Sequence, residues 1–204
     1  MKKIALAVLA VLFISPAAMA DNWGAGVKLG IGENDPKTMK DIYDQATMFD
    51  RELTKSPGYF SLEALYEWNL NDEANKIGAK IGWDMYGENE LKLKGLGNST
   101  KITEETYSLP ITVYYKRDNG VKNFSWFAGA GITILHTKIE FDAEDESKTK
   151  AFPHIAIGGE YRFTKLFALG LDARYNIGAK VKKDGDVLSD RSGFGAAITG
   201  RFYF

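Results

Sequence analysis

Charged residues that recur at every second position are the groups in this chain with the greatest capacity for chemistry. Six cations and five anions alternate with apolar neighbours and would share one face of extended segments: Lys28, Glu63, Glu67, Lys80, Asp84, Lys116, Glu160, Arg162, Asp172, Arg174 and Arg201. Opposite charges in a confined space must pair, because an isolated buried charge is costly. The same groups could instead line a narrow path for a solute. We favour a paired, side-chain-filled interior and keep the solute path as the alternative.

The two histidines, His136 and His154, are the candidates for acid–base catalysis. A lipid hydrolase would need a serine nucleophile beside a histidine that acts as its base. The sequence contains no adjacent Ser-His motif. We therefore predict no catalytic site and expect both histidines to be hydrogen-bonded or solvated.

Four acidic residues lie close together at Asp142, Glu144, Asp145 and Glu146. Carboxylate oxygens suit calcium, but this spacing matches no closed site and two lysines follow, so we predict a solvated segment. The chain has no cysteine, which excludes disulfides and cysteine-ligated metals. We predict no metal and no cofactor. The formal net charge of −1 gives no indication of a nucleic-acid partner.

The N-terminal residues have the features of a secretory signal peptide. Two lysines precede an unbroken apolar run over residues 4–14, and Ala18 and Ala20 place small residues at the spacing that a signal peptidase requires. The apolar run is too short for a transmembrane helix, which needs about 20 residues. We predict cleavage after Ala20, with residues 1–20 as the signal peptide and residues 21–204 as one mature domain.

Eight later stretches alternate between apolar and polar residues, which is the period of a β-strand. They cover residues 23–32, 59–70, 77–86, 106–117, 124–135, 154–163, 167–177 and 194–204. The apolar face of each stretch carries no charge, and the other face carries the charged residues named above. The predicted fold class is all-β, an eight-stranded antiparallel up-and-down barrel.

Alternation alone does not say which face of such a barrel points inward. A soluble lipocalin-like carrier would bury the apolar face, whereas a membrane barrel turns that face toward lipid. A charge facing the middle of a bilayer costs about 2–4 kcal/mol, so the charged face cannot be the lipid face. Aromatic residues such as Trp68, Trp83, Tyr107 and Phe163 lie near the ends of the stretches, where interfacial girdles occur. We predict a transmembrane barrel with its charges inside, and the soluble carrier is its rival.

The connections between the stretches alternate in length. The long ones cover residues 33–58, 87–105, 136–153 and 178–193, and the short ones lie near 71–76, 118–121 and 164–166. Long outer loops and short periplasmic turns are typical of outer-membrane barrels. We predict that the odd-numbered strands run outward and that both ends of the mature domain are periplasmic.

One short connection predicts a strand register. The Asn-Gly pair at residues 119–120 is favoured in a two-residue hairpin. This turn would place Tyr115 opposite Phe124 and Val113 opposite Trp126, with all four residues on the apolar faces.

The first long connection carries apolar residues at helical spacing, including Met39, Ile42, Tyr43 and Phe49. A short amphipathic helix over the barrel mouth and an irregular loop are both open interpretations. In either case we predict a contact surface for a partner, because loops on rigid scaffolds often carry function.

The closing stretch ends on aromatic residues, and Phe202 and Phe204 resemble the C-terminal insertion signal that the outer-membrane assembly machinery reads. Residues 109–111, 127–131 and 158–162 read Leu-Pro-Ile, Phe-Ala-Gly-Ala-Gly and Gly-Gly-Glu-Tyr-Arg. These segments resemble the small outer-membrane β-barrel (porin-like) family, which is related in architecture to the OmpA transmembrane domain. The resemblance covers most of the mature domain.

This resemblance implies a location in the outer membrane, with membrane lipid and the barrel-assembly machinery as partners. The family shares a fold and a location but not one activity. We predict a structural, surface-interacting protein whose long loops contact a ligand or another protein. A narrow channel is the alternative, and a lipid-modifying enzyme is less favoured.

Overall fold

The computed structural model describes residues 23–70, 74–95, 98–118, 123–141, 144–183 and 186–204. The predicted signal peptide, Asp142 and the predicted hairpin pair 119–120 lie outside these ranges. Strands dominate the described part of the chain, and one short helix, α2 (Lys37–Gln45), accompanies them.

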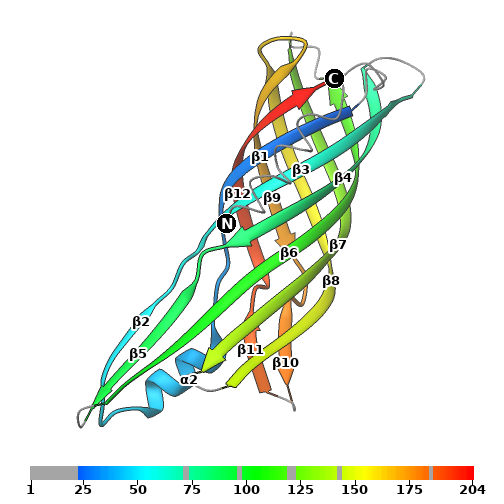
Figure 1. Cartoon of the computed structure of the whole chain (residues 1–204). Coiled ribbons are helices and arrows are strands. Elements are labelled where there is room, and N and C mark those ends of the chain that lie inside the picture. Colours follow the sequence, from blue (N-terminus) through cyan, green and yellow to red (C-terminus); the bar gives the residue numbers. More distant parts are fainter. Residues whose placement is uncertain (1–22, 71–73, 96–97, 119–122, 142–143, 184–185) are drawn as a thin grey trace.

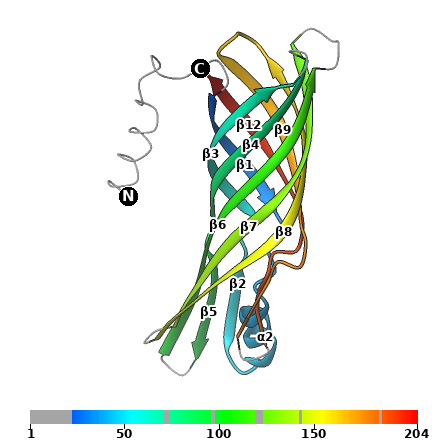
Figure 2. The same ribbon diagram turned by 90° about the vertical axis from the view of Figure 1, so that its right-hand side faces the viewer.

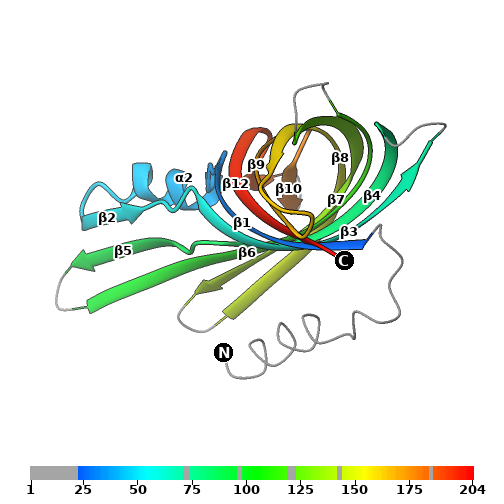
Figure 3. The same cartoon turned by 90° about the horizontal axis from the view of Figure 1, so that it is seen from above.

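The strands close into a barrel. Its members are β1 (Trp23–Gly32), β3 (Gly58–Asn69), β4 (Asn75–Tyr86), β6 (Asn98–Asp118), β7 (Phe124–Phe141), β8 (Glu144–Arg162), β9 (Phe167–Asn176) and β12 (Gly193–Tyr203). They follow the order β6–β4–β3–β1–β12–β9–β8–β7, and a pairing of β6 with β7 closes the ring (Figures 1 and 3). Every neighbouring pair is antiparallel. The predicted eight-stranded antiparallel barrel is confirmed.

The apolar face of the barrel points outward. Trp68, Ile81, Val113 and Leu171 are 48%, 44%, 58% and 66% exposed, although a soluble carrier would bury them together. Exposed hydrophobic residues on this scale need a hydrocarbon environment. The lipocalin-like rival is therefore wrong.

Beyond one end of the ring the chain builds a second structured region, which we call the head (Figure 2). It contains α2, β2 (Asp50–Thr54), β5 (Asn89–Gly95), β10 (Lys180–Lys183), β11 (Asp186–Asp190) and the extensions of β6, β7 and β8 over residues 98–106, 136–141 and 144–152. Strand β2 pairs with β5, and β5 pairs with the extension of β6, so the barrel sheet continues into the head. Strands β10 and β11 form a separate hairpin.

The expectation of long loops is corrected for three connections. Residues 89–95 pair with 98–104, residues 136–141 pair with 144–149, and β10 pairs with β11. The alternation continues past the membrane region, with Ile102, Glu104 and Ile139 buried on the inner face and Lys101 and Lys138 on the outer one. Continued alternation keeps the ladder intact, so these segments form hairpins rather than irregular loops.

The predicted register of the β6–β7 hairpin is wrong. Tyr115 pairs with Ala128 and Val113 with Ala130, instead of with Phe124 and Trp126. The difference is four residues, an even shift that leaves every side chain on its predicted face. The alternation of apolar and polar residues therefore could not reveal the error. The connection between β6 and β7 is longer than a two-residue turn, because Asp118 pairs with Ser125.

The first long connection contains a helix, so the helical interpretation is correct. Met39 on α2 is fully buried, and it is removed from the predicted contact surface because its side chain packs into the core of the head. Among the described residues, no helix has both the length and the apolar composition needed to cross a membrane.

Candidate functional site

The inward faces of the barrel strands bring together the charged side chains predicted from the sequence. All eleven take part in ion pairs within the described chain. Inward glycines make room for large side chains in the interior. A Cβ on Gly78 would lie 2.3 Å from Cζ of Tyr114, so a larger residue there would force the Tyr114 ring to shift.

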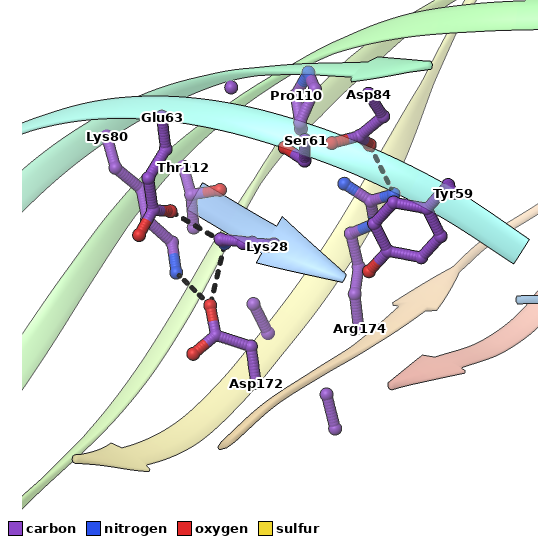
Figure 4. Close-up of a pocket in the computed structure, with 13 residues that line it drawn as sticks. Lys28, Tyr59, Ser61, Glu63, Lys80, Asp84, Pro110, Thr112, Asp172 and Arg174 are labelled. Carbon is purple, nitrogen blue, oxygen red and sulfur yellow. Dashed lines mark hydrogen bonds and ion pairs between the residues drawn. The ribbon is translucent and has the colours of Figure 1, made fainter. Parts of the chain in front are cut away.

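A central cluster is organised around Arg201 on β12. Its guanidinium donates to Oε1 of Glu63 at 2.6 Å, to Oε2 of Glu160 at 3.0 Å and to Oδ2 of Asp172 at 2.7 Å. Lys28 on β1 bridges Glu63 at 2.6 Å and Asp172 at 2.7 Å. Lys80 from β4 approaches Asp172 at 3.3 Å (Figure 4). Six strands, β1, β3, β4, β8, β9 and β12, are thus tied together through the interior.

A second cluster fills the barrel end near the C-terminus. Nζ of Lys116 lies 2.9 Å from Oε1 of Glu67 and 2.5 Å from Oε1 of Glu160. Tyr203 donates its hydroxyl to Glu160 at 2.7 Å, and Tyr114 donates to Glu67 at 3.0 Å. Two further cations lie at the margin of this cluster, Lys76 at 3.5 Å from Glu67 and Arg162 at 3.7 Å from Glu160.

A third cluster lies toward the head. Arg174 donates to Oδ2 of Asp84 at 2.7 Å, and Ser108 donates to the same oxygen at 2.9 Å. His154 is held between Thr112 at 2.9 Å from Nε2 and Thr133 at 2.8 Å from Nδ1. Both ring nitrogens therefore have a hydroxyl partner, and neither partner is a serine.

Little space remains between these side chains. A cavity of about 30 Å³ lies between the central and third clusters, bordered by Lys28, Asp172 and Arg174 (Figure 4). A cavity needs about 10–15 Å³ of this kind of volume to hold one water molecule. A smaller space of about 10 Å³ lies beside Lys116 and Tyr203. Neither space leaves room for a solute to pass.

A buried ion pair joins the barrel to the head. Arg191, which is 1% exposed, lies 3.6 Å from Oε1 of Glu104 and over the ring of Tyr86 at 4.4 Å. Ser189 donates to Glu104 at 2.8 Å. Burial lowers the pKa of Arg191, and the Glu104 carboxylate opposes that change. This pair anchors the segment before β12 to the extension of β6.

Beyond this ion pair, the head has an apolar core. It contains Met39, Leu91, Ile102, Leu135, Ile139, Phe152, Ala179, Val181 and Leu188. Ile42 and Tyr43 pack against it half-buried, and Arg51 stacks on the Tyr43 ring at 4.5 Å. Phe49 and Met48, in the turn between α2 and β2, are 45% and 96% exposed.

The other residues singled out from the sequence, Phe202, Phe204 and His136, lie outside the interior clusters. Phe202 is exposed on the lipid face, and the Phe204 amide donates to the Trp23 carbonyl across the closing strand pair. His136 stacks on Tyr107 at 4.7 Å and bonds to Thr149. In the described part of the chain, no group of three metal-ligating side chains could hold a metal ion.

Sequence reasoning missed several members of the interior. Lys76 and Glu104 share the face of Lys80 and Ser108, so extending the alternation by one or two steps would have found them. Arg191 lies in a segment without alternation, and no sequence signal marks it.

Comparisons with known proteins agree with this architecture. The model of the outer membrane protein beta-barrel domain matches residues 4–202. The crystal structure of Neisserial surface protein A is similar with a TM-score of 0.55 and 14% identity, over 89% of this chain and 97% of that one. That likeness, at such low identity, shows the fold alone.

Two further solved structures have lower scores. Ail, the attachment invasion locus protein of Yersinia pestis, has a TM-score of 0.48 and 15% identity over 89% of this chain and 95% of its own. The N-terminal barrel domain of Pseudomonas aeruginosa OprF has a TM-score of 0.45 and 11% identity over 91% of this chain and 100% of its own. No curated protein sequence matches the chain significantly.

Proposed function

The chain belongs to the family of outer membrane protein beta-barrel domains, and on that premise we propose that it is a non-conducting anchor that presents its head at the cell surface. As a member of this family it is an integral protein of the outer membrane. The proposal concerns what the barrel does there, which family membership leaves open.

The filled interior is the observation that carries the proposal. Arg201 binds three carboxylates at 2.6 to 3.0 Å, and the cavity beside this cluster has a volume of only about 30 Å³. An eight-stranded barrel has an interior just wide enough for side chains to fill. Ions need a continuous wet path, so these packed ion pairs argue against the narrow channel.

The head supports the display role. Its apolar core and its own paired strands make it a rigid body rather than a set of loose loops. Structured segments longer than the opposite turns are typical of the extracellular end of such barrels. The contact surface we propose for a ligand or protein comprises the accessible parts of Ile42 and Tyr43 together with Phe49 and Met48.

We propose no enzymatic activity. The nitrogens of His154 are occupied by two threonines inside the barrel, and His136 is stacked on Tyr107. In the described part of the chain, the hydrogen bonds of both histidines go to threonines, and none goes to a serine that could act as a nucleophile.

The closing strand β12 would be read by the barrel-assembly machinery, with Phe202 and Phe204 as its aromatic signal. We expect Phe204→Ala to lower the amount of folded barrel in cells while leaving refolding in detergent unchanged. Heat-modifiable migration on gels measures both. An equal loss in both settings would show that Phe204 acts on barrel stability instead.

Epitope insertion tests which end of the barrel faces the outside. One tag is inserted between Gly95 and Asn98 in the head, and a matched tag between Leu70 and Ala74 at the opposite end. We expect antibody to label the head tag on intact cells and the other tag only after the outer membrane is permeabilised. Labelling of the second tag on intact cells would overturn the display role.

A further inference from the structure

One edge of the head sheet has no partner strand in the described part of the chain. The head continues the barrel sheet in the order β2, β5, β6, β7 and β8, and the extension of β8 over residues 144–152 pairs only with β7. The ladder between β8 and β9 begins at His154, which pairs with Asn176. Beyond Asn176 the chain forms the β10–β11 hairpin instead. In Figures 2 and 3 the paired ends of β7 and β8 lean away from β10.

This free edge presents main-chain groups from every second residue. The carbonyl oxygen of Pro153 accepts a hydrogen bond from the amide of Ile177 at 3.0 Å, so the main-chain polar groups of Pro153 point away from β7. In a strand, the main-chain groups of successive residues point to opposite edges. Ser147, Thr149 and Ala151 share the parity of Pro153. Their N–H and C=O groups therefore point to the free edge, where an added strand could bind them.

The edge is accessible from both faces of the sheet. All five residues of the stretch 147–151 are exposed, although neighbouring side chains in a strand point to opposite faces. The side chain of Lys150 reaches toward β10, where its Nζ donates to the carbonyl oxygen of Lys180 at 2.9 Å. This contact uses no main-chain group of β8, so it leaves the edge open.

Two lysines set the charge of the edge. Lys148 and Lys150 lie on the same face, on either side of Thr149, and in the described part of the chain neither is paired with a carboxylate. A second copy of the edge, paired antiparallel about Thr149, would place Lys148 opposite Lys150. Like charges at opposite positions are unfavourable, and lysines on edge strands prevent such self-association. Carboxylates at alternate positions of a different strand would instead complement both lysines.

We propose that this stretch of residues 147–151, which we call the β8 edge, binds an extended acidic segment of a partner protein by strand addition. Main-chain hydrogen bonds would hold the segment, and its alternate side chains would provide specificity. Both lysines would stand in non-hydrogen-bonded pairs, in which opposite side chains are closest. The β8 edge is separate from the surface around Met48 and Phe49, because β2 and β8 lie at opposite ends of the head sheet.

Fluorescence anisotropy with two synthetic peptides tests the charge preference of the β8 edge. One labelled peptide alternates threonine with glutamate, and its matched control alternates threonine with lysine. Each is titrated with folded protein in micelles of a zwitterionic detergent, so the result is independent of which end of the barrel faces outward in cells. We expect the acidic peptide to bind saturably and about ten-fold more tightly than the basic one. Equal binding of both, or no binding of the acidic peptide, would overturn the proposal.

Two variants of Thr149 test whether the peptide binds to the main chain of the edge. Thr149→Pro removes an outward N–H that the β7 ladder does not use, and proline is tolerated at such edge positions. Thr149→Ala keeps this N–H, and both variants lose the hydroxyl contact with His136. We expect Thr149→Pro to abolish binding of the acidic peptide and Thr149→Ala to retain it. Equal binding by the two folded variants, identified by heat-modifiable migration, would overturn strand addition.

Reversal of one charge tests the same site without altering the main chain. Lys148→Glu should lose the preference for the acidic peptide, whereas Lys40→Glu on the exposed face of α2 adds the same charge elsewhere in the head and should keep it. An unchanged preference in Lys148→Glu would overturn the proposal. Sedimentation identifies the rival occupant, because a concentration-dependent dimer that Thr149→Pro abolishes would assign the β8 edge to a second copy of the chain.

Discussion

Arg201 connects three carboxylates that come from three different strands, Glu63 on β3, Glu160 on β8 and Asp172 on β9. Removing one partner from a buried ion pair costs about 3–5 kcal/mol, because the remaining charge stays buried without compensation. We expect Arg201→Met to lower the free energy of unfolding by an amount of this order. Urea unfolding in lipid vesicles, followed by heat-modifiable migration, measures the change.

An exposed pair in the head provides the control for this variant. Lys101 pairs with Glu90 on the outer surface of the β5–β6 hairpin, and such surface pairs contribute about 0–1 kcal/mol. Lys101→Ala should therefore leave the urea midpoint nearly unchanged. Equal and small effects of the two variants would mean that the interior pairs do not hold the barrel together.

The faces of individual residues could be predicted from the sequence, but their partners could not. Alternation places Arg201 and Glu63 on the inner face. They lie 138 positions apart, and the stagger of the closed barrel decides that they meet. A sequence read one strand at a time contains no information on that stagger.

At the level of elements, α2 depends on one buried side chain. Its N-cap residue, Pro36, provides no side-chain hydrogen bond, so packing of Met39 into the core must stabilise the helix. We expect Met39→Asp to unfold the head and leave the barrel folded, because the ion pairs of the barrel interior do not involve α2. Hydrogen exchange should show protection lost in β2, β5 and β11 and retained in β9 and β12.

Lys40→Ala on the exposed face of the same helix is the matched control and should preserve protection in the head. If Met39→Asp abolished the heat-modifiable form as well, the head and the barrel would be one cooperative unit. That outcome would contradict the expectation that the head unfolds independently of the barrel.

The elements themselves were partly predictable. Period-two alternation identified the eight barrel strands, because every one has a lipid face and an inner face. It did not fix the register of β6 with β7, since an even shift preserves the faces. It also did not decide whether the segment around Met39 is a helix or a folded loop, because the apolar spacing fits both. Only the structure shows the core against which this segment packs.

On the scale of the whole molecule, the protein has two apolar regions and one charged region, and each occupies its own part of the structure. The outer wall meets lipid, the ion pairs fill the barrel, and the second apolar region is the core of the head. The sequence predicted the first two regions. The third was missed because most of its residues come from the four long connections, which were expected to be loops or were left open.

Current across planar lipid bilayers tests the closed, filled barrel most directly. Purified protein is refolded, checked for heat-modifiable migration and inserted into a bilayer under applied voltage. The ion-paired interior predicts a baseline current without discrete steps for the intact protein. Reproducible single-channel steps that scale with salt concentration would contradict the account, because they require a continuous aqueous path where the structure has ion pairs.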